Sequence, residues 1–162
     1  MVAAAKHKGA AVVEELCNCV IFADGIHKLV TDSAVRADKT ITLEHGKPMI
    51  YGKDRNKGLI LDGWDIKPVT IGENGITEAD LLVHDAHKAD PTFHLKLAMM
   101  GYSPYGYAGA TDELPIALGV IRDVEAMTYD QAVAEQIEDV KGKKPQRTLR
   151  DLLLSGDTWE VK

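Results

Sequence analysis

An almost continuous apolar run near the N-terminus constrains the fold of this chain more than any other feature. Residues 10–16 are mostly apolar and lead directly into Cys17 and Cys19. A run of this length and character is typical of a strand that is buried on both faces, as in a parallel sheet. The neighbours Glu14 and Glu15 point to opposite faces of such a strand, so one carboxylate has to be solvated, paired or used. The sequence therefore predicts an α/β fold in which this strand ends in a thiol-bearing turn.

Cys17 and Cys19 are the only two cysteines among the 162 residues. A tetrahedral zinc ion or a cubane iron–sulfur cluster needs about four ligands, which this pair does not supply. Either the thiols are inert core residues, or the chain provides one corner of a site that other residues complete. Since free cysteines are among the most buried residue types, the residues alone favour the inert alternative.

Composition excludes several classes of protein. A chain of 162 residues suits one domain, and 45% hydrophobic with 27% charged residues is typical of a soluble globular protein. The net charge of −6 argues against a nucleic-acid partner. The sequence contains no uninterrupted apolar stretch of about 18 residues, so no membrane span is predicted. The N-terminus also lacks the apolar core of a signal peptide. With two neighbouring thiols, these features indicate a reducing, cytoplasmic location.

Hydrophobic periodicity and turn residues predict a β-rich middle followed by a helical end. Strands are expected at residues 40–44, 49–52, 59–61, 66–71 and 115–122, with the middle ones antiparallel. Short helices are expected at 3–8, 31–36, 77–88, 91–100, 128–141 and 148–154. A loop rich in glycine and tyrosine is expected at 101–113. Val133, Ile137 and Val140 follow helical spacing and predict the buried stripe of the helix at 128–141.

A second group of candidate ligands lies between positions 84 and 94. His84 and His87 are three residues apart, hence neighbours on one face of a helix, and Asp90 and His94 follow. Such a set could hold a metal ion that activates water for hydrolysis. The spacing differs from the His-Glu-x-x-His pattern, whose histidines are four apart, and Pro91 turns His94 out of register. The pattern therefore favours packing or hydrogen-bonding roles over a metal site.

Seven stretches, in order along nearly the whole chain, are similar to one enzyme family. They are residues 18–22 (NCVIF), 24–27 (DGIH), 43–50 (LEHGKPMI), 70–77 (TIGENGIT), 83–92 (VHDAHKADPT), 117–122 (ALGVIR) and 158–160 (TWE). On these stretches the chain resembles the C-terminal half of the β subunit of 2-oxoacid:ferredoxin oxidoreductases. The branch it resembles is the one that handles 2-oxoglutarate or related 2-oxoacids. The family tends to have an apolar residue where Glu15 stands, which is a departure in the predicted strand.

The resemblance implies a fold and a division of the chain. Residues 1–38 are expected to be the end of a thiamine-diphosphate-binding α/β domain. Residues 39–162 are expected to be a C-terminal α+β extension, with a β-rich part at 39–72 and a helical part at 73–162. The loop at 101–113 is usually shorter in the family.

The resemblance also implies a site residue. In the family the cysteine at the position of Cys19 is the isolated fourth ligand of a [4Fe-4S] cluster, whose other ligands lie in the N-terminal half of the subunit. The family does not usually have a cysteine at the position of Cys17, so a core or surface thiol is expected there. The Gly-Asp-Gly motif that binds Mg²⁺ and the cofactor diphosphate does not occur in this sequence. The chain is therefore expected to be half a subunit, and inactive alone.

The function implied for the intact enzyme is the oxidative decarboxylation of a 2-oxoacid to acyl-CoA. Thiamine diphosphate, Mg²⁺ and the [4Fe-4S] cluster are the expected cofactors. The expected partners are the α subunit, ferredoxin, the 2-oxoacid and coenzyme A. Two alternatives from other classes stay open: a non-catalytic docking module, and a metal hydrolase built on His84 and His87.

Overall fold

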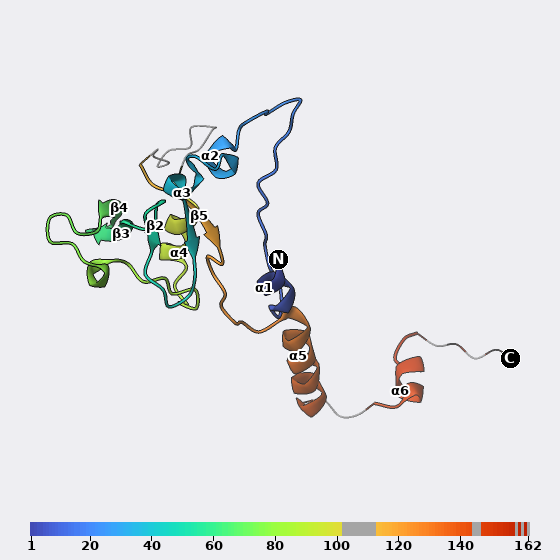
Figure 1. Ribbon diagram of the computed structural model, residues 1–162. Coiled ribbons are helices and arrows are strands. Elements are labelled where there is room, and N and C mark those ends of the chain that lie inside the picture. The colour runs from blue at the N-terminus through green and yellow to red at the C-terminus, as the bar shows by residue number, and fades with distance from the viewer. Residues whose placement is uncertain (102–112, 144–146, 158, 160, 162) are drawn as a thin grey trace. The chain divides into compact units, whose positions relative to one another are not determined.

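The computed structural model describes residues 1–101, 113–143, 147–157, 159 and 161 (Figure 1). It contains two compact units. The first consists of Met1–His7 and Ala11–Glu125, and the second of Lys8–Ala10 and Ala126–Lys162. The predicted loop at 101–113 falls almost entirely on residues outside the described part. The predicted division between residues 38 and 39 remains a prediction.

Two small sheets form the centre of the first unit. Strand β1 (Thr40–Leu43) pairs in parallel with β5 (Ile116–Gly119), so that Ile41 lies opposite Ala117. The second sheet has the order β2-β3-β4 and is antiparallel throughout. Its strands are β2 (Ile50–Tyr51), β3 (Lys57–Asp62) and β4 (Asp65–Thr70). The described residues therefore form a mixed α/β structure with one parallel and one antiparallel sheet.

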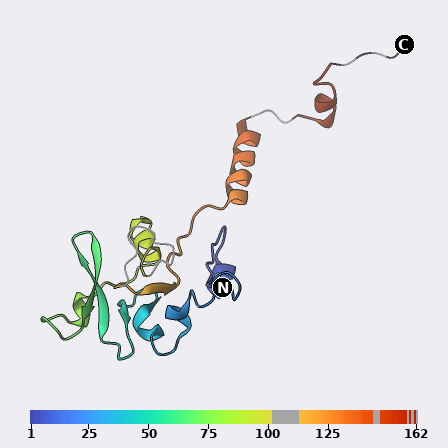
Figure 2. The ribbon, with the colours of Figure 1, turned by 90° about the horizontal axis from the view of Figure 1, so that it is seen from above.

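The hydrophobic core lies between these sheets and helix α4 (Thr92–Ala98), which Figure 2 shows beside β5. In β1 the pleat sends Ile41 and Leu43 inward and exposes Thr42, which is the alternation that a half-buried strand requires. From α4, Leu97 is completely buried in the same cluster. The buried residues of the core are Ile41, Leu43, Met49, Tyr51, Leu59, Ile66, Leu97 and Met100.

The predictions for the strands of the middle region are confirmed within a few residues at each end. The strands expected at 40–44, 49–52, 59–61, 66–71 and 115–122 correspond to β1 to β5. The antiparallel pairing is correct for β2, β3 and β4, whereas β1 pairs in parallel with the distant β5. Asp62-Gly63 forms the expected tight turn between β3 and β4, and Gly63 adopts a φ of +61°.

The prediction of a buried strand at residues 10–16 is wrong. This segment forms no strand, and its side chains are exposed; Val12 retains 97% of its surface. A strand that is apolar on both faces needs neighbours on both edges and both faces. No strand of the described residues pairs with this segment, so its backbone groups and its apolar side chains remain in water.

The helix predictions are confirmed in part. The helix expected at 77–88 is wrong: Thr77 and Asp80 form the expected capping box, but only the 3₁₀ turn η1 (Glu78–Asp80) follows. The chain then runs extended, because Leu82 and His84 bond to the backbone of neighbouring segments. The helix expected at 31–36 is also wrong. Short helices flank that segment instead: α2 (Lys28–Thr31) and α3 (Arg36–Lys39).

The remaining helices lie near their predicted positions. They are α1 (Val2–Lys6), α4, α5 (Tyr129–Lys143) and α6 (Leu149–Leu153). The predicted stripe of α5 is not buried, since Ile137 and Val140 are exposed. Both α6 and η1 begin with a Thr-x-x-Asp capping box, in which each side chain satisfies a backbone N–H of the other residue. No helix of the described residues is long and apolar enough to cross a membrane.

The end of β5 leaves no room for a side chain, which generates the first prediction. Gly119 has a φ of +97°, and a Cβ atom there would lie 2.6 Å from the carbonyl oxygen of Leu43 on the paired strand. Gly46 has a φ of +75°, but nothing lies within 4 Å of its Cβ position. Gly46→Ala should therefore cost only the backbone strain, about 1–2 kcal/mol. Gly119→Ala should cost ~1–3 kcal/mol more, because the two strands must move apart.

Urea unfolding of both variants measures this difference, with Gly46→Ala as the matched control for positive φ. Equal midpoints for the two variants would contradict the close approach between β1 and β5.

Candidate functional site

Cys19 lies at the start of a tight turn. The N–H group of Ala23 donates to the carbonyl oxygen of Cys19 at 2.9 Å, and these two residues form an isolated β-bridge. The side chain of Asn18 then fixes the ends of the turn. Its amide donates to Asp24 at 3.2 Å, and its oxygen accepts the N–H of Gly25 at 2.9 Å. The predicted thiol-bearing turn is present, although the strand predicted before it is not.

Backbone N–H groups of the turn face the Cys19 thiol. Those of Phe22 and Ile21, and more weakly that of Ala23, hold the pKa of the thiol below its ordinary value, against the opposing effect of desolvation. Hydrogen bonds to the charged form favour that form, so the turn stabilises a thiolate. The Cys19 side chain is exposed and is therefore accessible to a reagent or a metal. The position of this thiol is evident from the sequence, whereas the N–H donors depend on the backbone path of the turn.

The donor set of this turn fits one corner of a metal–sulfur site. A thiolate that accepts backbone N–H bonds is the kind of ligand that iron–sulfur clusters use. Cys17 is exposed as well, so it is not the core residue that one alternative expected. Since the chain contains two cysteines, it supplies at most half of the four thiolates that such a cluster takes. Cys19 is thus suited to hold a cluster only together with ligands from elsewhere.

The histidines of the second candidate site bond to the protein backbone. His84 donates from Nε2 to the carbonyl oxygen of Val120 at 2.8 Å, and His94 donates from Nε2 to that of Asp85, also at 2.8 Å. Both side chains are buried, with 1% and 4% of their surface exposed. His87 is exposed and donates from Nδ1 to the carbonyl oxygen of Asp123 at 2.5 Å. These bonds favour the hydrogen-bonding role over the metal site.

The metal-ligand set of the disfavoured alternative is not brought together. The placement of His84 and His87 on one face of a helix is wrong, because the segment that carries them is not helical. The carboxylate of Asp90 accepts from the N–H and the hydroxyl of Thr92 at the start of α4. Within the described residues, no group of three or more His, Cys, Asp or Glu side chains is arranged to hold a metal ion.

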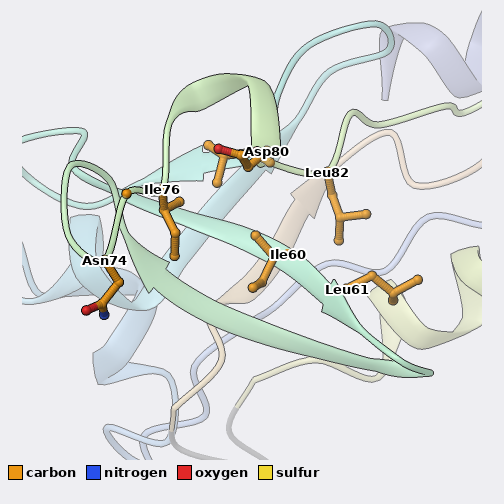
Figure 3. A pocket seen from close by; sticks show the side chains of 8 residues that line it. Ile60, Leu61, Asn74, Ile76, Asp80 and Leu82 are labelled. Atoms are coloured by element: carbon orange, nitrogen blue, oxygen red, sulfur yellow. The ribbon is translucent and has the colours of Figure 1, made fainter.

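A hollow of about 500 Å³ lies between β3 and the loop that follows β4 (Figure 3). Figure 3 shows the side chains of Ile60, Ile76 and Leu82 around it, with Asp80 at its rim. The carboxylate of Asp80 already accepts from the N–H and the hydroxyl of Thr77, and these bonds lower its pKa. The lining of the hollow is therefore mixed, because the polar side chains of Asn74 and Asp80 join the apolar ones. No pattern in the sequence predicts it, because its walls come from separate segments.

The chain is similar to one curated protein over almost its whole length. The 2-oxoglutarate oxidoreductase subunit KorB of Mycobacterium tuberculosis is 29% identical over 161 residues, which is 98% of this chain and 40% of that protein. The chain thus spans about two fifths of the length of the relative that it matches. No protein-family model matches the sequence, and no solved structure matches the chain. The chain is therefore a distant relative of a subunit of a 2-oxoglutarate oxidoreductase.

Proposed function

We propose that this chain is part of the β subunit of a 2-oxoacid:ferredoxin oxidoreductase, and that Cys19 is one ligand of its [4Fe-4S] cluster. The observation that carries the proposal is the similarity to KorB, which extends over 98% of the chain. The intact enzyme would decarboxylate a 2-oxoacid such as 2-oxoglutarate, pass the acyl group to coenzyme A and send electrons singly to ferredoxin. The α subunit and the rest of the β subunit are the partners that the proposal requires.

The turn at Cys19 supports this role for its thiol. The N–H groups of Phe22, Ile21 and Ala23 stabilise the thiolate, which is the form that binds iron. Such N–H bonds to cysteine sulfur are also one of the means by which proteins set the potential of a cluster. When bound, the cluster supplies one-electron transfer. The chain's own contribution is to present one exposed thiol in a turn whose backbone N–H groups favour the thiolate.

The sequence carries no motif for the other cofactors of the proposed enzyme. The sequence contains no Gly-Asp-Gly motif for Mg²⁺ and the diphosphate of thiamine diphosphate. Under the proposal these groups belong to the part of the β subunit that this chain does not span. We assign no residue of the chain as a general acid or base, and catalysis by the chain alone is not expected.

A docking module without a cluster is the second candidate function. The observation that favours it is the exposed apolar segment around the thiols, in which Val12 and Phe22 retain 97% and 90% of their surface. Exposed apolar patches of this kind mark surfaces that bind another protein. Both functions therefore expect a partner at this segment, and they differ in whether Cys19 holds iron.

Replacing each cysteine in the intact complex separates these functions. The complex is purified anaerobically from its source through a tag on this chain, and iron, sulfide and the electron paramagnetic resonance of the reduced cluster are measured. Loss of a residue that only supports a metal ligand lowers metal affinity by about 10–100-fold. Since Cys19 is proposed as a ligand itself, Cys19→Ala should lower cluster content by at least ~10-fold and abolish 2-oxoglutarate-dependent electron transfer.

Cys17→Ala is the matched control, because Cys17 is also an exposed thiol and lies two residues away. It should retain the iron content, the resonance and the activity of the natural complex. A complex that contains no cluster, or in which Cys19→Ala changes nothing, supports the docking module instead.

The pKa of Cys19 gives a test on the isolated chain. Since backbone N–H groups lower the pKa of the thiol, its alkylation by iodoacetamide should reach full rate at a lower pH in the folded chain than in concentrated urea. The Cys17→Ala variant is used so that only Cys19 reacts, and mass spectrometry follows the reaction. The same pH profile in both states would show that the turn does not stabilise the thiolate.

The exposed apolar segment predicts how the isolated chain behaves. Without a partner, the chain should associate with itself, and light scattering should give a mass above that of one chain. The double variant Val12→Asp/Phe22→Asp should shift the mass toward the monomer. Tyr129→Asp is the matched control, because this exposed residue lies on α5, outside the segment. If the unmodified chain is a stable monomer, the idea that this segment binds a partner is contradicted.

A further inference from the structure

Two buried histidines of the first unit have only one protonation state that suits their surroundings. His84 and His94 each place Nε2 at 2.8 Å from a backbone carbonyl oxygen, which only accepts hydrogen bonds. Nε2 therefore carries the proton, and Nδ1 of each neutral ring carries a lone pair. Both Nδ1 atoms are buried, and neither has a hydrogen-bond partner. A proton added at Nδ1 would be a buried donor without an acceptor, which is costly.

The charges around these rings add to that cost. The ring centroids of His84 and His94 are 6.3 Å apart, so two imidazolium ions would repel each other. Burial lowers the pKa of His84 most, the charges of His94 and His45 lower it further, and the carbonyl oxygen of Val120 and the carboxylate of Asp85 oppose these effects. The carboxylate of Asp90 also faces His94. The net balance favours the neutral ring of His84.

Hydrogen bonds of His84 and His87 help to connect two segments of the chain, residues 84–90 and 120–123. His84 bonds to Val120, and His87 bonds to Asp123. The N–H of Asp123 donates to the carbonyl oxygen of Ala86 at 2.8 Å. Finally, Arg122 donates to the carbonyl oxygen of Ala89 at 3.2 Å. No strand pairing joins these segments among the described residues, so the connection depends on hydrogen bonds of this kind, and histidine side chains make two of these four.

A third histidine stabilises the same loop in its neutral form. The N–H of Ala86 donates to Nδ1 of His45 at 3.2 Å, which requires that this nitrogen carries no proton. The ring of His45 lies 4.2 Å from that of His87, so protonation of both would place two cations together. The carboxylate of Asp85, 3.5 Å from Nδ1 of His45, opposes this repulsion. On the other segment, the carboxylate of Asp123 accepts from His7 at 2.7 Å.

We propose that the loop of residues 84–90 is a proton-sensitive latch, which holds residues 120–123 while the ring of His84 is neutral and releases them when this ring takes up a proton. The segment that it releases leads directly to Ala126, where the larger part of the second unit begins. The latch is independent of the proposed oxidoreductase function and involves neither cysteine.

The direction of the pH dependence follows from linkage. The folded pKa of His84 is below the ordinary value of 6.5, so the open state binds more protons between these two values. The latch is therefore at full strength above about pH 6.5 and weakens as the pH falls through this window. Each proton taken up changes the opening equilibrium by at most about tenfold per pH unit.

Hydrogen–deuterium exchange of the full chain tests the latch. Exchange is followed by mass spectrometry between about pH 7.5 and about pH 5.5, on both sides of the ordinary histidine pKa, with rates corrected for intrinsic exchange. As the pH falls, the protection factor of peptides that contain residues 120–123 should drop by up to about tenfold per pH unit for each proton that the open state binds in excess. The protection factor of peptides of β3 should not change. Constant protection of residues 120–123 relative to β3 would overturn the proposal.

Two variants test which histidine is responsible. Gln in place of His84 keeps a neutral donor for Val120 but does not titrate, so His84→Gln should retain most of the protection at low pH. His27→Gln is the control, because His27 lies at the start of α2, outside the latch. His84→Gln with the pH dependence of the natural chain would overturn the proposal. If this variant does not fold, the nuclear magnetic resonance titration of the His84 ring decides: an ordinary midpoint near pH 6.5 contradicts the latch.

Discussion

The parallel pairing of β1 with β5 is the constraint on which the rest of the first unit depends. A parallel pair needs a long connection, and in this chain residues 44–115 form it. The antiparallel sheet, the loop with His84 and helix α4 all lie within this connection. Because Ile41 and Leu43 of β1 face the core, the connection has to fold back over them, and Leu97 of α4 completes the cluster. The contact of Gly119 with Leu43 fixes how closely the two strands approach.

Local patterns in the sequence are sufficient to predict most elements of this unit. The strands β2 to β4 are predictable because alternating residues and turn signals such as Asp62-Gly63 act within a few positions. The parallel partner of β1 is not, since nothing in residues 40–43 indicates a strand more than seventy positions away. The capping box at Thr77 is correctly predicted, yet the helix does not continue. Bonds of Leu82 and His84 to distant backbone groups outweigh the local preference.

The candidate site, too, has features that the sequence predicts and others that only the folded backbone determines. Cys19 is recognised by resemblance, and its turn by Asp24-Gly25, but the N–H groups that face the thiol follow only from the backbone. The strand expected before it requires neighbours that the described residues do not provide. For the histidines, spacing alone places His84 beside His87 on a helix, which is wrong. The burial of His84 and its bond to Val120 arise from the end of β5, so no local pattern could have revealed them.

The turn at Cys19 has a kinetic consequence. The hydrogen bonds that define it join residues 18–25 only, so its closure requires a loop of fewer than ten residues. Loops of about this size close in roughly 10–100 ns, far faster than the parallel pair β1–β5 can assemble across the connection of residues 44–115. The turn that carries Cys19 can therefore close before the parallel pair assembles. Because these bonds hold the turn in the folded chain, a metal or partner that binds there has little backbone left to order.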